Sequence, residues 1–300
     1  MIRRPPRSTQ GVSSAASDVY KRQDYTPPKV NVRSTQLSWV YAGDLDLDGH
    51  MDVVSVHESD TAYDDVPDGH IRLAFVSEDP DQWTLATLAE GLEAAAPEDA
   101  DIADVNGDGA LDLLLTTFRR GTLCLLNDGK GQFTDVTAKA GLESRTSGTT
   151  LALGDVDHDG DLDLYVANFG ELLLLRDGGS FAVRQVGGKS MVTGQHAKRL
   201  KIINGRLIEF GETDAFYLND GQGVFQRVPW GTDRCVRADG QPLTEPLDFG
   251  LCVQMRDING DGHVDIYVCN DFQTPDRFWL NDCLLYTSDA ADDTPCVDLG

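Results

Sequence analysis

The stretch Asp257-Ile-Asn-Gly-Asp-Gly-His-Val-Asp265 follows the pattern D-x-N-x-D-G-x-x-D. It has side-chain oxygens at loop positions 1, 3, 5 and 9 and a glycine at position 6. Hard cations such as Ca²⁺ take about six to eight oxygen ligands, and a tight loop with such side chains at alternate positions supplies most of them. Gly262 permits the sharp bend that turns Asp257, Asn259 and Asp261 toward one centre. The stretch therefore predicts a site for a divalent cation.

Three more stretches have the same spacing of acidic, amide and glycine residues. They are Asp44, Asp46, Asp48, Gly49 and Asp52; Asp104, Asn106, Asp108, Gly109 and Asp112; and Asp155, Asp157, Asp159, Gly160 and Asp163. Asp, Asn and Gly are also common in ordinary turns. Four copies of one spacing nevertheless favour metal-binding loops over ordinary turns.

The loops are spaced like a structural repeat. They begin at residues 44, 104, 155 and 257, so they are 60, 51 and 102 residues apart. Because the last interval is twice 51, a fifth unit is expected near residue 206. Residues 201–210 have a turn between two apolar runs and no acidic ladder. We interpret this segment as a repeat without a metal site, or as an insertion within a repeat.

Short runs rich in β-forming residues flank every loop. Those before the loops are 39–42, 101–103, 150–153 and 251–255, and those after them are 52–56, 112–116, 163–167 and 265–269. Third runs at 123–127, 172–176 and 215–219 each end before Asp-Gly, a hairpin signal, and fourth runs begin at Phe133, Phe181 and Phe225. In the first unit, 71–77 and 83–88 supply the outer strands. We therefore predict an all-β chain that forms a partial β-propeller of about five four-stranded antiparallel blades with calcium-binding loops.

The composition narrows the classes of partner. The formal net charge is −25, with 50 acidic and 25 basic residues, which disfavours nucleic acid because phosphates need basic partners. No apolar run approaches the roughly 20 residues of a membrane span. The sequence has no G-x-S-x-G elbow, no phosphate loop and no H-E-x-x-H motif. Since the repeats account for nearly all paired carboxylates as metal ligands, we predict that the chain is not an enzyme.

The two ends of the chain have an unusual relationship. Residues 13–23 read SSAASDVYKRQ, and residues 283–292 read CLLYTSDAAD. One DNA string can encode the first, and its reverse complement, shifted by one base, encodes the second. Both ends resemble translated sequencing-adapter DNA, so we expect 1–23 and 283–300 to be non-native segments. Residues 24–282 are then a truncated propeller, and the true N-terminus with any signal peptide is missing.

The position of the loops separates two calcium-binding families. An EF-hand needs a glutamate at loop position 12 and flanking helices, but Ser55, Leu115, Val166 and Val268 occupy that position within predicted strands. The strand–loop–strand setting resembles the FG-GAP/VCBS repeat family, which is related to the calcium-binding blades of integrin α-subunit heads. The motifs that carry the resemblance are GDVDHDGDLDLYVAN at 154–168 and YLNDGQGVF at 217–225. Residues 257–282, with NDFQTPDR at 270–277, are similar to the cartilage-acidic-protein-like branch, which is often found in bacterial surface or secreted proteins.

The resemblance covers most of 24–282 and implies about four Ca²⁺ sites. The side chains at positions 1, 3, 5 and 9 would bind the ion together with the backbone carbonyl at position 7. By position, those carbonyls belong to His50, Ala110, Asp161 and His263. The imidazoles of the two histidines are then expected to be bystanders. No metal site carries over to the segment near residue 206.

The expected function is recognition or adhesion in an extracellular, cell-surface or periplasmic setting. The ligand would be a protein or a glycan, and the remaining blades of the full-length chain would close the ring. The alternative is the propeller domain of a secreted hydrolase or lyase that acts on polysaccharides. A purely structural spacer is a third interpretation.

Four cysteines lie outside the two adapter-like segments: Cys124, Cys235, Cys252 and Cys269. Cys252 precedes the last loop and Cys269 follows it, so a hairpin closed by that loop would place them opposite each other. We favour buried free thiols for these residues. A disulfide between Cys252 and Cys269, which would fit a secreted protein, is the alternative.

Overall fold

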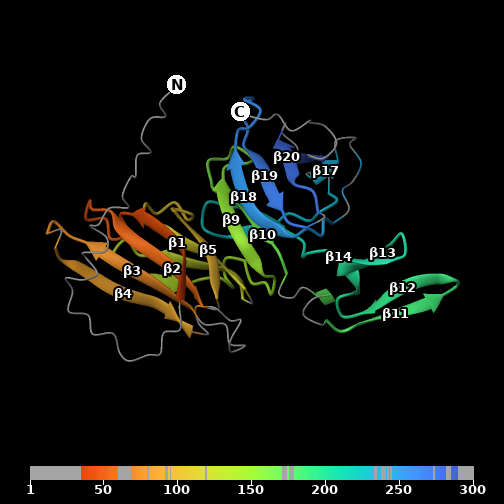
Figure 1. The fold of residues 1–300 in the computed structure, drawn as a ribbon. Coiled ribbons are helices and arrows are strands. Elements are labelled where there is room, and N and C mark those ends of the chain that lie inside the picture. Colours follow the sequence, from red (N-terminus) through yellow and green to blue (C-terminus); the bar gives the residue numbers. More distant parts are fainter. Residues whose placement is uncertain are drawn as a thin grey trace, which may run out of the picture.

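The computed structural model describes residues 35–59, 69–79, 81–91, 94, 96–118, 120–170, 174–175, 179–232, 235–237, 241, 243, 245–272, 274–281 and 285–289. These residues form antiparallel sheets joined by loops, and none of them lies in an α-helix (Figure 1). This confirms the predicted all-β class. Within these ranges, no helix is long and apolar enough to cross a membrane.

The first two sheets have the predicted strand order. The first sheet consists of β1 (Thr35–Gly43), β2 (Asp52–Ser59), β3 (Gly69–Val76) and β4 (Trp83–Glu90). The second sheet consists of β5 (Pro97–Ala103), β6 (Asp112–Thr117), β7 (Gly121–Asn127) and β8 (Phe133–Asp135). Strands adjacent in sequence pair antiparallel throughout both sheets.

The third sheet contains an insertion. Its strands are β9 (Gly148–Gly154), β10 (Asp163–Asn168), β15 (Ala215–Asn219) and β16 (Phe225–Arg227). Between β10 and β15 the chain forms two hairpins. The first pairs β11 (Phe181–Val186) with β12 (Lys189–Gly194), and the second pairs β13 (Leu200–Ile203) with β14 (Arg206–Glu209). The 3-10 turn η4 (Ala197–Arg199) links the two hairpins. In Figure 1 these hairpins extend away from the sheets. The segment near residue 206 is therefore an insertion within a repeat, the second of the two predicted interpretations.

The prediction of 172–176 as the third strand of this unit was wrong. Residues 174–175 form a π-helical turn, and Phe181 begins an inserted hairpin rather than the fourth strand. The third strand is β15, which lies beside β10 in the sheet. Its last residue, Asn219, donates its backbone N–H to the buried carboxylate of Asp163 at 3.0 Å. Residue 176 is an arginine, whereas an asparagine precedes Asp-Gly at the ends of β7 and β15.

The fourth sheet has the order β17-β21-β20-β19-β18, with β17 (Cys235–Arg237), β18 (Gly250–Arg256), β19 (Asp265–Asn270), β20 (Arg277–Asn281) and β21 (Leu285–Asp289). Strand β21 pairs antiparallel with β20 and parallel with β17. It lies in the segment 283–300 that resembles adapter DNA, and the non-native origin of that segment stays a prediction.

The sheets follow one another in a row through their first strands. Strand β5 lies between β1 and β9, and β9 lies between β5 and β18. About five blades were predicted, whereas the described residues form four sheets of four or five strands and two short inserted hairpins. Within those residues the row is not closed into a ring.

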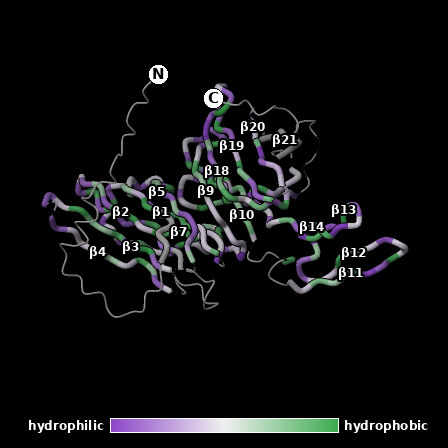
Figure 2. The backbone as a smooth tube through the Cα atoms, viewed as in Figure 1, coloured by the Kyte–Doolittle hydropathy of each residue, from purple (hydrophilic) through white to green (hydrophobic). Residues whose placement is uncertain are grey.

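The second strand of each middle sheet contributes to two hydrophobic cores. Leu113 and Leu115 of β6 pack with the first sheet, while Leu114 between them packs with the third. In the same way, Leu164 and Val166 of β10 face the second sheet and Tyr165 faces the fourth. Both strands are buried along their whole length for this reason. Figure 2 shows apolar segments concentrated in the strands and hydrophilic residues in the loops at their ends.

A buried carboxylate lies at the end of β10 remote from the Asp155–Asp163 loop. Asp214 is 2% exposed and accepts hydrogen bonds from the Tyr165 hydroxyl at 2.9 Å and the Asn168 N–H at 2.7 Å. Burial raises the pKa of Asp214 to about 7, against an opposing effect of these two donors. The folded protein therefore holds this proton more tightly than the unfolded chain does.

The Asp214 proton predicts a pH dependence of stability. Its contribution is fully present below pH 4 and is lost as the pH rises through about 7. Between pH 4 and 7, this group should lower the free energy of unfolding by up to about 1.4 kcal/mol per pH unit. Urea unfolding from pH 4 to 7.5 should show a smaller fall for Asp214→Asn than for the parent protein. The exposed control Glu245→Gln should keep the parental slope, and equal slopes for all three proteins would contradict the assignment.

Candidate metal sites

The four predicted loops occupy equivalent places, each joining the first strand of its sheet to the second. They connect β1 to β2, β5 to β6, β9 to β10 and β18 to β19. The glycine at position 6 has a positive φ in every loop: 89° at Gly49, 87° at Gly109, 96° at Gly160 and 92° at Gly262. A side chain is strained in this conformation. The structure therefore confirms the sharp bend that the sequence predicts.

The acidic side chains hold each loop in a tight curve. In the fourth loop, Asp257 Oδ1 accepts the N–H groups of Gly260 and Asp261 at 2.6 and 3.2 Å. Its Oδ2 accepts the N–H of Gly262 at 2.9 Å. The carboxylate at position 5 accepts the N–H of position 7 in all four loops, at 2.8–3.0 Å, from His50, Ala110, Asp161 and His263.

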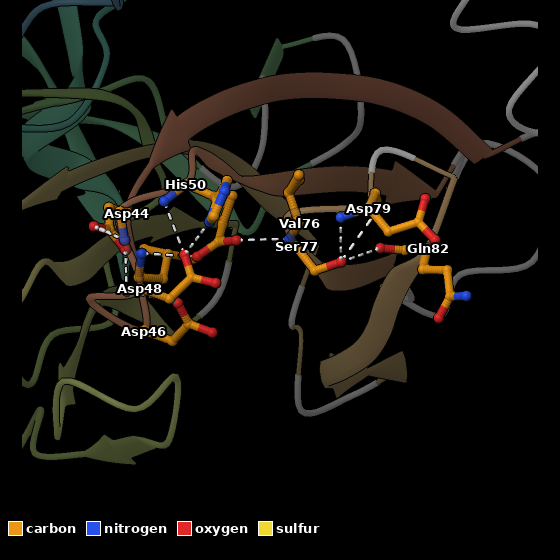
Figure 3. Close-up of polar contacts among 11 residues, drawn as sticks. Asp44, Asp46, Asp48, His50, Val76, Ser77, Asp79 and Gln82 are labelled. Carbon is orange, nitrogen blue, oxygen red and sulfur yellow. Dashed lines mark hydrogen bonds and ion pairs between the residues drawn. The ribbon is translucent and has the colours of Figure 1, made fainter.

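Two loops bring three carboxylates together. Asp44, Asp46 and Asp52 each offer an oxygen within 4.8 Å of the others, and so do Asp155, Asp157 and Asp159. Figure 3 shows Asp44, Asp46 and Asp48 on the first loop. Burial and the neighbouring Asp52 and Asp48 raise the pKa of Asp46 above its ordinary value. Such crowding favours a bound cation.

The third loop also contains a buried carboxylate oxygen that could accept a further ligand, Oδ1 of Asp155. Asp155 Oδ1 is buried and accepts no hydrogen bond from the residues that the structure describes, although Oδ2 of the same carboxylate accepts the Gly160 N–H at 3.3 Å. A buried carboxylate oxygen without a partner is costly. A divalent cation ligated by Asp155, Asp157 and Asp159 would satisfy it, so these residues fit a Ca²⁺ ion.

The second and fourth loops differ at position 3, where both have asparagine. The side-chain amide nitrogens of Asn106 and Asn259 donate to Asp108 and Asp261 at 3.0 and 2.9 Å. The amide oxygens of both asparagines accept the N–H of position 5. These loops therefore present oxygen donors with one fewer negative charge, which lowers the affinity expected for Ca²⁺.

The aspartates at position 9 have a second role that the sequence did not reveal. Asp52, Asp112, Asp163 and Asp265 begin the second strand of each sheet and are 0% exposed. One oxygen accepts the N–H of loop position 2, and the other accepts an N–H from the end of the third strand, all at 2.8–3.1 Å. Burial raises the pKa of Asp112 and Asp163 to about 6, against the effect of these donors. These carboxylates therefore brace each loop against the third strand of its sheet.

Asparagines connect the first three loops to the sheet that follows each of them. The side-chain amides of Asn127, Asn219 and Asn281, at the ends of the third strands, donate to the carbonyl oxygen of position 2 in the preceding loop. The acceptors are Leu45, Val105 and Val156, at 2.7–2.9 Å. The peptide groups around position 2 are thus held on one side by the position-9 aspartate and on the other by the next sheet. An asparagine directly before the hairpin turn was the available sequence signal.

Two histidines predicted as bystanders make specific contacts. His50 Nδ1 lies 3.1 Å from Asp48 Oδ1 in its own loop. His263 Nδ1 lies 2.7 Å from Nε2 of His158, so the third and fourth loops meet through their imidazoles. The bystander interpretation concerned the metal ion and stays a prediction.

A shallow groove of about 610 Å³ lies along the first strands of the second, third and fourth sheets. It is lined by Asp101 of β5, by Leu151–Leu153 of β9 and by Val253–Arg256 of β18. Burial raises the pKa of Asp101 above its ordinary value. The lining is about equally polar and apolar, and its polar side chains are Asp101, Gln254 and Arg256.

Solved structures resemble the chain only at a low level. One is the crystal structure of the V. cholerae biofilm matrix protein Bap1, with 14% identity, a TM-score of 0.28 and coverage of 78% of this chain; the chain spans 38% of the Bap1 chain. Another is BBS1N in complex with ARL6DN, with 13% identity, a TM-score of 0.27 and coverage of 86% and 83% of the two chains. At these scores neither carries a structural argument.

No curated protein matches the chain. A family profile described as FG-GAP-like repeat matches residues 73–166. The match begins in β3, includes the whole second sheet with its loop, and ends in β10 after the third loop. Residues 73–166 therefore match the FG-GAP-like repeat family, in agreement with the resemblance seen in the sequence.

Proposed function

We propose that the chain is a calcium-binding β-propeller scaffold for recognition or adhesion outside the cytoplasm, at the cell surface or in the periplasm. The observation that carries the calcium assignment is the partnerless, buried Oδ1 of Asp155 within a group of three carboxylates. Three further loops with the same backbone bend extend the assignment to about four ions.

The proposed role of the ions is structural. Each loop joins two strands of one sheet, and the first three loops also contact the next sheet through an asparagine amide. A cation in the loop would neutralise the acidic side chains and fix the turn between the strands. Recognition then takes place on a surface whose loops are held in one conformation, with a protein or a glycan as the proposed ligand.

We propose binding rather than catalysis for this surface. A hydrolase or lyase needs an acid and a base that converge on the substrate in one pocket. The groove along the first strands offers Asp101 as its one acid, together with Arg256 and Gln254. The loop carboxylates accept backbone N–H groups, which suits ion binding better than proton transfer.

Calcium should raise the thermal stability of the protein. At a free Ca²⁺ concentration 100 times Kd, one site contributes about 2.7 kcal/mol to the free energy of unfolding. Asp155→Ala should lose the contribution of one site, and isothermal titration calorimetry should show one ion fewer bound. The control Glu245→Ala alters an exposed acid outside the loops and should bind as the parent does. Equal melting temperatures in Ca²⁺ and in chelator would overturn the proposal.

A further inference from the structure

Cys252 and Cys269 lie directly opposite each other on neighbouring strands. They form a register pair of β18 and β19, next to the pair Val253 and Val268. Residues directly opposite in an antiparallel pair have Cβ atoms about 4.5–5.5 Å apart and project to the same face. A disulfide needs a Cβ separation of about 3.5–4.5 Å. A small adjustment at the adjacent bulge, between Gly250 and Cys252, therefore allows the bond.

The two thiols are accessible, contrary to the sequence-based expectation of burial. Both are free in this structure, with Cys252 exposed and Cys269 half-buried. The neighbouring Val253 and Val268 are buried on the other face of the sheet. Cys124, by contrast, is fully buried, and burial raises the pKa of its thiol to about 12. Cys124 is thus an internal example of an unreactive thiol in the same chain.

The cysteine pair flanks the fourth calcium loop symmetrically. Strand residues 252–256 lead into the loop, and 265–269 lead out of it. A bond between Cys252 and Cys269 would keep these arms paired and would reduce the conformations open to the loop before an ion binds. Pre-organisation of this kind raises affinity because less conformational entropy is lost on binding.

We propose that Cys252 and Cys269 form a disulfide that clamps the fourth hairpin and strengthens Ca²⁺ binding by the Asp257–Asp265 loop. The second half rests on the proposed calcium function, whereas the disulfide itself does not. By thermodynamic linkage, Ca²⁺ favours the disulfide by the same factor by which the disulfide favours Ca²⁺.

The oxidant is a small-molecule disulfide of the glutathione class. The thiolate of the exposed Cys252 attacks one sulfur of oxidised glutathione, and one glutathione thiolate leaves. The Cys269 thiolate then attacks Cys252 Sγ in the mixed disulfide and releases the second glutathione. Two protein thiols lose two electrons and two protons, and two molecules of reduced glutathione form. Burial and the neighbouring Cys269 raise the pKa of Cys252, so the reaction should run faster at pH 9 than at pH 7.

The first experiment tests the bond in the full chain with Cys235, Cys283 and Cys296 replaced by serine. After equilibration with oxidised glutathione and alkylation, peptide mapping should show a linked pair of peptides that contain Cys252 and Cys269. Cys124 should be alkylated only after unfolding. The proposal is overturned if Cys252 and Cys269 are both alkylated in the oxidised sample, or if either one links to Cys124 instead.

The second experiment tests the coupling to the ion. Calorimetric Ca²⁺ titration of the oxidised protein should show one site with a Kd roughly tenfold lower than in the reduced protein. Cys252→Ser should behave as the reduced protein under both conditions, and Asp257→Ala should abolish the difference. Equal affinities in the two redox states would overturn the coupling. Formation of the disulfide without any Ca²⁺ binding would instead refute the calcium assignment and leave the disulfide supported.

Discussion

Replacing Asp112 with alanine is expected to lower the free energy of unfolding by roughly 2–6 kcal/mol, even in chelator. The carboxylate is 0% exposed and accepts the N–H of Val105 at 3.1 Å and that of Asn127 at 2.9 Å. Alanine leaves both buried donors without an acceptor, and each costs about 1–3 kcal/mol. Urea unfolding monitored by circular dichroism should measure the loss.

A matched variant separates this structural role from ion binding. Asp108 belongs to the same loop but is exposed and accepts one backbone N–H, that of Ala110, so Asp108→Ala should cost only about 1 kcal/mol in chelator. With Ca²⁺ present, Asp108→Ala should lose the ion-dependent stabilisation, since position 5 is a predicted ligand. If both variants were equally stable in chelator, the bracing role of Asp112 would be refuted.

Replacing Asp99 with alanine should lower the free energy of unfolding by roughly 3 kcal/mol or more. Asp99 of β5 is 4% exposed and joins three sheets. One oxygen accepts the Tyr41 hydroxyl of β1 at 2.8 Å, and the other accepts the Thr150 hydroxyl at 2.7 Å and the Leu151 N–H at 3.1 Å in β9. Alanine removes the acceptor for all of these donors at once.

Tyr41 provides a local readout for the Asp99 variant. Burial, together with the nearby charge of Asp99, raises the pKa of Tyr41 well above its ordinary value. Ultraviolet titration of Asp99→Ala should show tyrosine ionisation at lower pH than in the parent. Thr150→Val removes only one of the hydrogen bonds and should cost about 1 kcal/mol. An unchanged tyrosine titration in Asp99→Ala would show that the two side chains do not interact in solution.

The loops were predictable because the signal is local. Five residues within nine positions define each turn, and the glycine at position 6 has the positive φ that the bend requires. The strands on either side of each loop were also placed correctly, since short β-forming runs adjoin it. The positions of these elements are determined by residues close to them in the sequence, so a local pattern is enough to predict them.

The remaining features depend on distant partners. The buried Asp163 accepts the backbone N–H of Asn219, which lies 56 residues later in the chain. The leucine-rich run at 172–176 has strand character on its own, but β15 takes the place beside β10. Likewise, the carbonyl of Leu45 finds its donor in Asn127, 82 residues away. Periodicity and spacing contain no information about such pairings.

The inserted hairpins have a consequence for the order of folding. Strands β10 and β15 are separated by 46 residues, whereas three to nine residues separate the second and third strands of the other sheets. By the logarithmic dependence of closure entropy on chain length, joining β10 to β15 costs about 1–2 kcal/mol more than the other closures. High contact order slows folding. The third sheet should therefore be the last to form. Until it forms, the second and fourth sheets would each have one apolar face exposed to water.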